Sequence, residues 1–304
     1  MRQSASSPAK CQSKSSIYIK WNREHPKNKI IFIGFFLFSY VAFSQTDDED
    51  VILNGVLDEL FNMDSPLVDF DRSDYLYATF SFDDKVYFAG RDFGINQYSF
   101  TPNISYMRGQ NFFLSLGSAY FSELNPNWDF ISLSSGYSVF LDNSELFNLT
   151  GIYSRIFFSA DADELNPNRL AISLVYHKKN LRTRLSGGYL FGGSSSFYLA
   201  PNGSYDLKLI SKDNWDLTFS PVLGFLFSQQ TVSEQISSGF STQRIDQDVF
   251  ELINTQFEFP FELDLGQWDF ELSYKINSPN PLNNETNISN TSFFTFTIGY
   301  FVGL

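Results

Sequence analysis

From Tyr75 to Leu304, apolar and polar side chains alternate with a period of two residues. In residues 291–304, TSFFTFTIGYFVGL, Phe294 and Phe296 fall on one face and Thr295 and Thr297 on the other. This period is that of a β-strand whose two faces meet different surroundings. The alternation predicts twelve strands, at residues 77–91, 97–107, 111–122, 128–141, 146–158, 169–177, 181–191, 196–210, 215–227, 252–265, 268–276 and 291–303.

Most of these segments are long enough to cross a bilayer, for which a tilted strand needs roughly 9 to 11 residues. In nine of the twelve, the more apolar face carries no Asp, Glu, Lys or Arg. A water-soluble sandwich also alternates. Three features favour a transmembrane barrel: Tyr and Phe near the strand ends, connections that alternate short and long, and a last strand that ends the chain. The short connections are RGQ, DNSE, HKKN, SKDN and GQ.

The strand count depends on two local readings. FDDK, at residues 82–85, could be a tight turn that divides the first segment, but an even number of strands favours an undivided one. Four prolines, Pro102, Pro201, Pro221 and Pro260, fall within predicted strands. Because proline removes a ladder donor, we expect them at bulges or kinks. If several mark loops instead, the count of twelve is wrong.

The N-terminal residues differ from the rest. KNKIIFIGFFLFSYVAFS, at residues 27–44, has a basic flank, an apolar run and a small-x-small end, as a signal peptide does. We therefore predict that 1–44 is a start-codon extension plus signal peptide, that 45–74 is an acidic, helical or loosely ordered periplasmic segment, and that 75–304 is the barrel. The mature chain has 14 Lys and Arg against 33 Asp and Glu, a net charge of −19, which argues against nucleic acid as a partner. Cys11 is lost with the leader.

The terminal strand resembles that of the outer-membrane β-barrel proteins of Gram-negative bacteria. In that family an alternating apolar strand, usually with an aromatic last residue, is read by the barrel-insertion machinery. Phe296, Ile298, Tyr300 and Val302 match the alternation, and Leu304 replaces the aromatic residue. The abundance of Phe and Tyr and the acidic stretch after the leader resemble barrels of the Bacteroidota. The resemblance implies location in the cell outer membrane, with outer-membrane lipid and the insertion machinery as partners.

Enzymatic chemistry has little support in the sequence. The mature chain has one histidine, His177, beside Lys178 and Lys179 at a predicted periplasmic turn, where an ordinary turn residue is the simpler interpretation. DADE, at residues 161–164, is the nearest candidate for a calcium site, but the sequence favours a solvated acidic loop. No phosphate-binding glycine loop opens a helix. We therefore expect no catalytic residue, no metal and no cofactor.

The candidate functional residues are the charged side chains that the alternation directs into the lumen. They are Arg155, Arg169, Arg182, Arg184, Glu258, Glu262, Asp264, Asp269 and Glu271, with the basic and acidic sets expected on nearly opposite walls. An open lumen would form a narrow channel selective for small polar solutes, because pore-lining charges set selectivity. A closed lumen would be a salt-bridged plug in a structural anchor or an assembly or secretion component. A secreted soluble β-sandwich binding protein is the third alternative.

A Trp-Asp pair occurs three times, at Trp128, Trp215 and Trp268. A propeller would repeat it about every 40 to 45 residues, which these spacings do not. Trp215 and Trp268 are in phase with the apolar faces of their strands, so we predict that they lie at the membrane interface, where indole rings concentrate. Trp128 is out of phase unless a β-bulge lies near Phe130.

Overall fold

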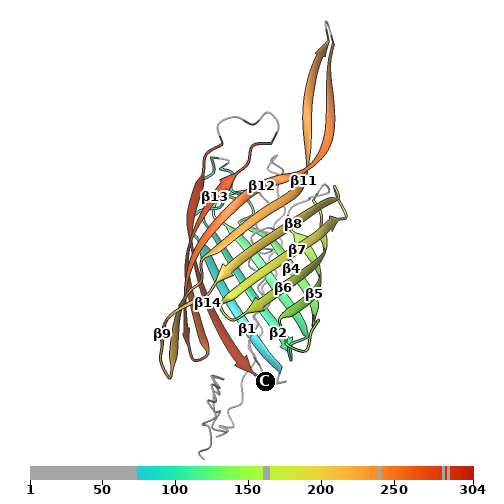
Figure 1. Cartoon of the computed structure of the whole chain (residues 1–304). Helices are drawn as coiled ribbons and strands as arrows, with labels where there is room; N and C mark the ends of the chain where they lie inside the picture. The colour runs from blue at the N-terminus through green and yellow to red at the C-terminus, as the bar shows by residue number, and fades with distance from the viewer. Residues whose placement is uncertain (1–73, 93, 160–164, 239–240, 283–284, 286–287) are drawn as a thin grey trace, which may run out of the picture. The chain divides into compact units, whose positions relative to one another are not determined.

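The computed structural model describes residues 74–92, 94–159, 165–238, 241–282, 285 and 288–304 (Figure 1). The predicted leader, all but the last residue of the acidic segment, and the DADE sequence lie outside the described residues. The strands are β1 (Asp74–Asp83), β2 (Ser99–Arg108), β3 (Phe112–Phe121), β4 (Trp128–Phe140), β5 (Phe147–Phe158), β6 (Asn168–Lys178), β7 (Leu181–Phe191), β8 (Ser196–Tyr205), β9 (Leu207–Ser211), β10 (Trp215–Phe219), β11 (Val222–Ser238), β12 (Ser241–Leu265), β13 (Trp268–Pro279) and β14 (Thr291–Gly303).

These strands form one antiparallel sheet that closes on itself. β1 pairs with both β2 and β14, and β11 pairs with both β8 and β12, so the ring closes. β9 continues β8, and β10 continues into β11, so the fourteen strands occupy twelve positions. The predicted twelve-stranded barrel is confirmed, and the two-sheet sandwich is wrong. Among the described residues there is no helix long and apolar enough to cross a membrane, which has no bearing on crossing by strands.

The outer face of the barrel is apolar. Its exposed side chains include Leu114 and Leu116 on β3, Ile131 and Leu133 on β4, and Leu272 on β13. Aromatic side chains gather near the strand ends: Phe80, Phe100, Tyr120 and Trp128 toward one rim, and Tyr137, Phe147, Tyr176, Trp268 and Tyr300 toward the other. An apolar band between two aromatic girdles is the surface of a transmembrane barrel.

The connections divide the barrel into two ends. The five short connections all lie at the end that also holds Asp74 and Leu304, which is the periplasmic end by the usual asymmetry. Four of the five contain a residue with positive φ, as tight turns require: Gly109, Glu145, Lys179 and Gly266. The opposite, external end carries the longer connections.

Two predicted boundaries are wrong. β1 ends at Asp83, inside FDDK, and the residues that follow form neither a continued strand nor a second one but a long connection to β2. The polar run at 228–248 is not a loop. It continues β11 and β12 as a two-stranded hairpin that extends beyond the other strands (Figure 1). In both places local polarity misled the assignment, because pairing partners decide where a strand ends.

All four strand prolines lie where a ladder is interrupted. Pro102 faces a gap in the β2–β3 register, and Pro201 faces a gap in the β8–β11 register. Pro221 separates β10 from β11, and Pro260 stands opposite this break, between the part of β12 that pairs with β11 and the part that pairs with β10. None marks a loop, so their missing donors leave the strand count intact.

The bulge required by Trp128 is present. The β3–β4 register shifts so that Tyr120 pairs with Trp128 and Ala119 with Phe130, which leaves Asp129 as the extra residue. The shift turns the Trp128 ring outward, 53% exposed, against Tyr120 at a centroid distance of 5.5 Å. Trp128 therefore joins the external girdle.

Candidate functional site in the barrel lumen

The inner wall from β2 to β7 is lined by small hydroxyl side chains that bond to one another across strands. Ser105 donates to Ser115 at 2.9 Å, Ser134 donates to Ser154 at 2.8 Å, and Ser186 donates to Ser173 at 3.0 Å. These side chains are short and their hydroxyls are hydrogen-bonded, so this wall is polar but projects little into the lumen. The charges lie mainly on the other strands.

The predicted arginines separate into three places. Arg182 and Arg184 alternate with the exposed Leu181 and Leu185, so they lie on the inner face near the periplasmic end. Arg169 is also inward, 2% exposed, and donates to Ser154 Oγ at 2.9 Å, but it stands at the external end of β6.

Arg155 is on the outer face, contrary to the prediction. It alternates with the buried Ser154 and Ile156, donates to Asn168 Oδ1 at 2.9 Å, and its guanidinium lies 5.7 Å from the centroid of the Phe157 ring. β5 is apolar on both faces, so its sequence does not reveal its orientation. The inward positions are those with small hydroxyls, not those with the charge.

The predicted carboxylates form two rungs on the inner wall near the periplasmic end. Asp264 on β12 stands directly opposite Asp269 on β13, and Glu262 stands opposite Glu271. Asp216 on β10 stands opposite Asp264, so the first rung holds three aspartates on three neighbouring strands. One oxygen from each of Glu262, Asp264 and Asp269 lies within 4.8 Å of the others.

Several neighbours anchor parts of these rungs. Tyr77 on β1 donates to Asp269 Oδ2 at 2.9 Å, and Lys208 on β9 forms an ion pair with Asp216 at 3.0 Å. The basic and acidic sets are only partly on opposite walls: of a largest possible separation of six positions in the ring, β6 and β13 are five apart, whereas β7 and β12 are three apart. In the periplasmic half, Arg182 and Arg184 on β7 are therefore a quarter of the ring away from the carboxylates of β12.

A second group of charged side chains lies on the same strands, β12 and β13, closer to the external end. Lys275 on β13, 2% exposed, forms an ion pair with Glu258 at 3.6 Å, and Ser273 donates to Glu258 at 2.8 Å. Asp83, at the end of β1, accepts hydrogen bonds from Ser99 and Thr295 at 2.9 and 2.6 Å. Glu258, like Asp216 in the first rung, forms an ion pair with a lysine.

The connection between β1 and β2 folds into the lumen. Its tip, Phe88-Ala89-Gly90-Arg91, is a two-residue hairpin turn, with Phe88 N to Arg91 O at 3.0 Å and Arg91 N to Phe88 O at 2.6 Å. Both central residues have positive φ, 41° and 81°, as a type I′ turn requires. This turn presents the Phe88 and Arg91 side chains from the same short loop.

The loop reaches several parts of the inner wall. Val86 packs against a buried cluster of Ala119, Phe121, Phe130 and Ile156 on β3, β4 and β5. Phe88 and Ala89 join a second cluster with Tyr198, Ala200, Leu226 and Ile253 on β8, β11 and β12. Since β8 and β11 are five and four positions from β1 around the ring, the loop crosses the external half of the lumen.

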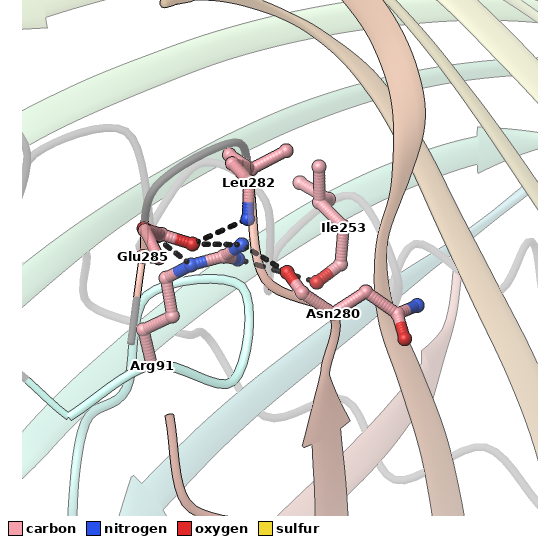
Figure 2. Close-up of polar contacts among 5 residues, drawn as sticks. All are labelled: Arg91, Ile253, Asn280, Leu282 and Glu285. Carbon is pink, nitrogen blue, oxygen red and sulfur yellow. Dashed lines mark hydrogen bonds and ion pairs between the residues drawn. The ribbon is translucent and has the colours of Figure 1, made fainter. Parts of the chain in front are cut away.

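Arg91 fastens the tip at the far side (Figure 2). Its guanidinium donates to the Ile253 carbonyl oxygen at 3.2 Å and to the Asn280 carbonyl oxygen at 2.6 Å, and forms an ion pair with Glu285 at 3.2 Å. The Glu285 carboxylate is itself placed by the Leu282 N–H at 2.8 Å. We call Arg91 with these partners the latch. Hydrogen bonds to charged groups are among the strongest in proteins, roughly 1.5 to 3 kcal/mol each.

A bulge in β12 prepares the receiving surface. The β11–β12 register pairs Leu226 with Asn254 and Phe227 with Leu252, so Ile253 is the extra residue. Bulges re-aim side chains. Here Ile253, 1% exposed, packs against the loop, and Asn254 lies under Gly90, where a Cβ would be 2.7 Å from Asn254 Oδ1 and from Asn277 Cβ. Only glycine fits this contact.

The two halves of the lumen therefore differ. In the external half, Tyr198, Leu226, Asn254 and Asn277 are buried beneath the loop. In the periplasmic half, Asp264 is exposed and Glu262, Asp269 and Glu271 are partly exposed, although all four side chains lie on the inner face. These rung side chains are therefore less completely buried than the residues beneath the loop.

The predicted set of lumen charges did not include Arg91, Asp83, Asp216 and Lys275. The alternation does place Asp216 and Lys275 on the polar faces of their strands, so both could have been added to the set. Asp83 and Arg91 were hidden by the misplaced end of β1. Trp215 and Trp268 open their strands on the outer face at the periplasmic end, and His177 Nε2 lies 2.9 Å from the Lys179 carbonyl oxygen at the predicted turn.

No protein-family model and no curated protein matches the chain by sequence. Among solved structures, the KdgM porin is 10% identical with a TM-score of 0.41 over 74% of this chain and 98% of that one. The NanC porin is 12% identical, with a TM-score of 0.41 over 75% and 99%. An outer membrane channel from Pseudomonas putida F1 is 11% identical, with a TM-score of 0.45 over 77% and 97%.

At these levels of similarity none of the three indicates a solute or a mechanism for this chain. The closed ring, the apolar outer band and the two aromatic girdles are observed directly in the structure of this chain. This protein has the fold of an outer-membrane β-barrel. By the usual asymmetry of the connections, the end with the short turns is assigned to the periplasm and the other end to the exterior.

Proposed function

We propose that the barrel is a narrow channel for small polar solutes, with a charged inner wall that selects among them. The observation that carries the proposal is the pair of like-charge rungs, Asp264 opposite Asp269 and Glu262 opposite Glu271. Like charges directly opposite on neighbouring strands are destabilising. Water in the lumen would hydrate and screen them, whereas a filled, interlocked interior would favour pairing each with a cation.

The sign of the wall gives the expected preference. Near the periplasmic end, the five inward carboxylates Asp216, Glu262, Asp264, Asp269 and Glu271 outnumber the cations Arg182, Arg184 and Lys208. Charges that line a narrow pore set which ions enter it. We expect cations to pass more readily than anions, with the adjoining arginines orienting solutes that carry both charges.

A closed barrel serving as an anchor or an assembly component is the second candidate. The observation that favours it is the loop that crosses the external half. A planar-bilayer recording distinguishes the channel from the closed anchor. The purified protein must first be shown to be folded by its heat-modifiable gel mobility. Discrete conductance steps support a channel. Silence from both the wild type and a variant with a released loop would favour the anchor.

The Bacteroidota resemblance, signal-peptide removal and entry through the insertion machinery remain proposals. The terminal strand supports the last: Phe294, Phe296 and Val302 are exposed on the outer face of β14. The intact mass of the mature protein tests removal of residues 1–44, since cleavage after Ser44 predicts one defined N-terminus at Gln45.

A further inference from the structure

We propose that the inward loop between β1 and β2 is a gate that controls passage through the barrel, and that the Arg91 latch holds this gate across the external half of the lumen. The inference rests on the proposed channel and assigns a regulatory element to it. The gate is the segment from Val86 to Arg91, and its seat is the inner surface formed by Tyr198, Leu226, Ile253 and Asn254.

The seat is specific to this loop. The β12 bulge contributes an apolar side chain, Ile253, for Phe88, and it places Asn254 directly beneath Gly90, where only a glycine fits. Thr291 Oγ1 donates to the Gly90 carbonyl oxygen at 2.7 Å, and Asn277 donates to Thr291 at 3.3 Å. A loop without a defined position in the lumen would not be matched by a β-bulge whose extra residue packs against it.

The latch is also the part of this contact nearest to the exterior. Glu285 and Asn280 belong to the external connection between β13 and β14, and the Glu285 side chain is 38% exposed while that of Arg91 is 9% exposed. Neutralising or binding the exposed Glu285 carboxylate from the external side would therefore weaken its ion pair with the buried Arg91. Because the Arg91 guanidinium contacts Ile253, Asn280 and Glu285 at once, its loss removes all three contacts together.

The release of the loop can be followed apart from conduction. Ala89 is 8% exposed in the docked loop and already has positive φ, so Ala89→Cys places a thiol there with little added strain. In a Cys11→Ser background this is the only thiol of the chain. A bulky, hydrophilic maleimide reacts at a rate that follows the population of the undocked loop, provided that docking is fast.

The experiment compares wild type, Arg91→Ala and Glu285→Gln in the folded full-length barrel, with Lys85→Ala as control. Lys85 is an exposed cation on the same loop. Arg91→Ala is expected to raise the labelling rate at least about tenfold, since losing a hydrogen bond to a charged group shifts an equilibrium by that factor or more. It should also increase single-channel conductance. Glu285→Gln should change both less, and Lys85→Ala neither.

The outcomes separate the gate from the channel. If Arg91→Ala labels faster and conducts more, both proposals are supported. If the wild type conducts and Arg91→Ala changes neither readout, or changes labelling alone, the gate is wrong while the channel stands. If neither protein conducts although labelling rises, the channel is wrong, and the gate with it. Glu285→Gln keeps the test decisive if Arg91→Ala does not fold.

Discussion

Asp264 and Asp269 stand directly opposite each other on neighbouring strands, and both point into the lumen. In a closed, protein-filled interior, two facing carboxylates would repel each other without screening. In a water-filled lumen the repulsion is screened, and the pair gives the wall a negative charge. For this reason we place the proposed selectivity of the channel in the periplasmic half of the barrel.

Neutralising this rung should reduce cation preference. In Asp264→Asn/Asp269→Asn, we expect the reversal potential in a KCl gradient to move toward that of a non-selective pore, because pore-lining charge sets selectivity. The fold should not lose stability, since a repulsive pair has been removed. Glu123→Gln, at an exposed external position, is the control and should leave the reversal potential unchanged. An equal shift in both would locate the selectivity elsewhere.

Alanine at Gly90 should cost more stability than alanine at Gly94. Both glycines have positive φ, 81° and 77°, but a Cβ at Gly94 has nothing within 4 Å. Gly94→Ala thus reports only the backbone cost, about 1 to 2 kcal/mol. Gly90→Ala adds the loss of loop docking, including burial of Phe88, worth roughly 1.5 to 3 kcal/mol. Urea unfolding of the two variants measures the difference, and equal losses would mean that the tip is not seated on Asn254.

Removing the buried cation Lys275 should destabilise the barrel strongly. Lys275→Met leaves Glu258 without its ion-pair partner at 3.6 Å, and breaking a buried pair costs roughly 3 to 5 kcal/mol. Adding Glu258→Gln should recover part of the loss, because the stranded carboxylate is then neutral. The readout is the unfolding free energy in urea. A double variant as unstable as the single one would show that Glu258 is not the group left uncompensated.

Charge on the outer face should cost more than charge on the inner face. Leu116 on β3 is 49% exposed on the outside, and a lysine there faces lipid at a cost of roughly 2 to 4 kcal/mol near the bilayer midplane. Thr297 on β14 points inward and is paired with Ser81. Thr297→Lys should therefore be the milder change when both variants are refolded into lipid vesicles. The reverse order would contradict the assigned faces.

Period-two alternation was sufficient to predict the closed barrel, the number of strands and the apolar outer face, because these follow from which side chains face lipid. It also required a bulge near Phe130, which the structure confirms. It could not orient β5, because both faces of that strand are apolar. Arg155 was therefore predicted on the inner face, whereas it lies on the outer face. Nor could it find the latch, because Arg91 meets Ile253, Asn280 and Glu285 only through long-range closure of the ring.

The most direct test of the central claim is the labelling pattern of single cysteines along β12 in the Cys11→Ser background. The acidic rungs are held to face a water-filled lumen, so a charged, hydrophilic thiol reagent should modify Glu262→Cys and Asp264→Cys in folded barrels in lipid. Phe261→Cys and Leu263→Cys, which alternate with them on the outer face, should stay protected. Protection at all four positions would contradict the account, because it would mean that the periplasmic half of the lumen is filled.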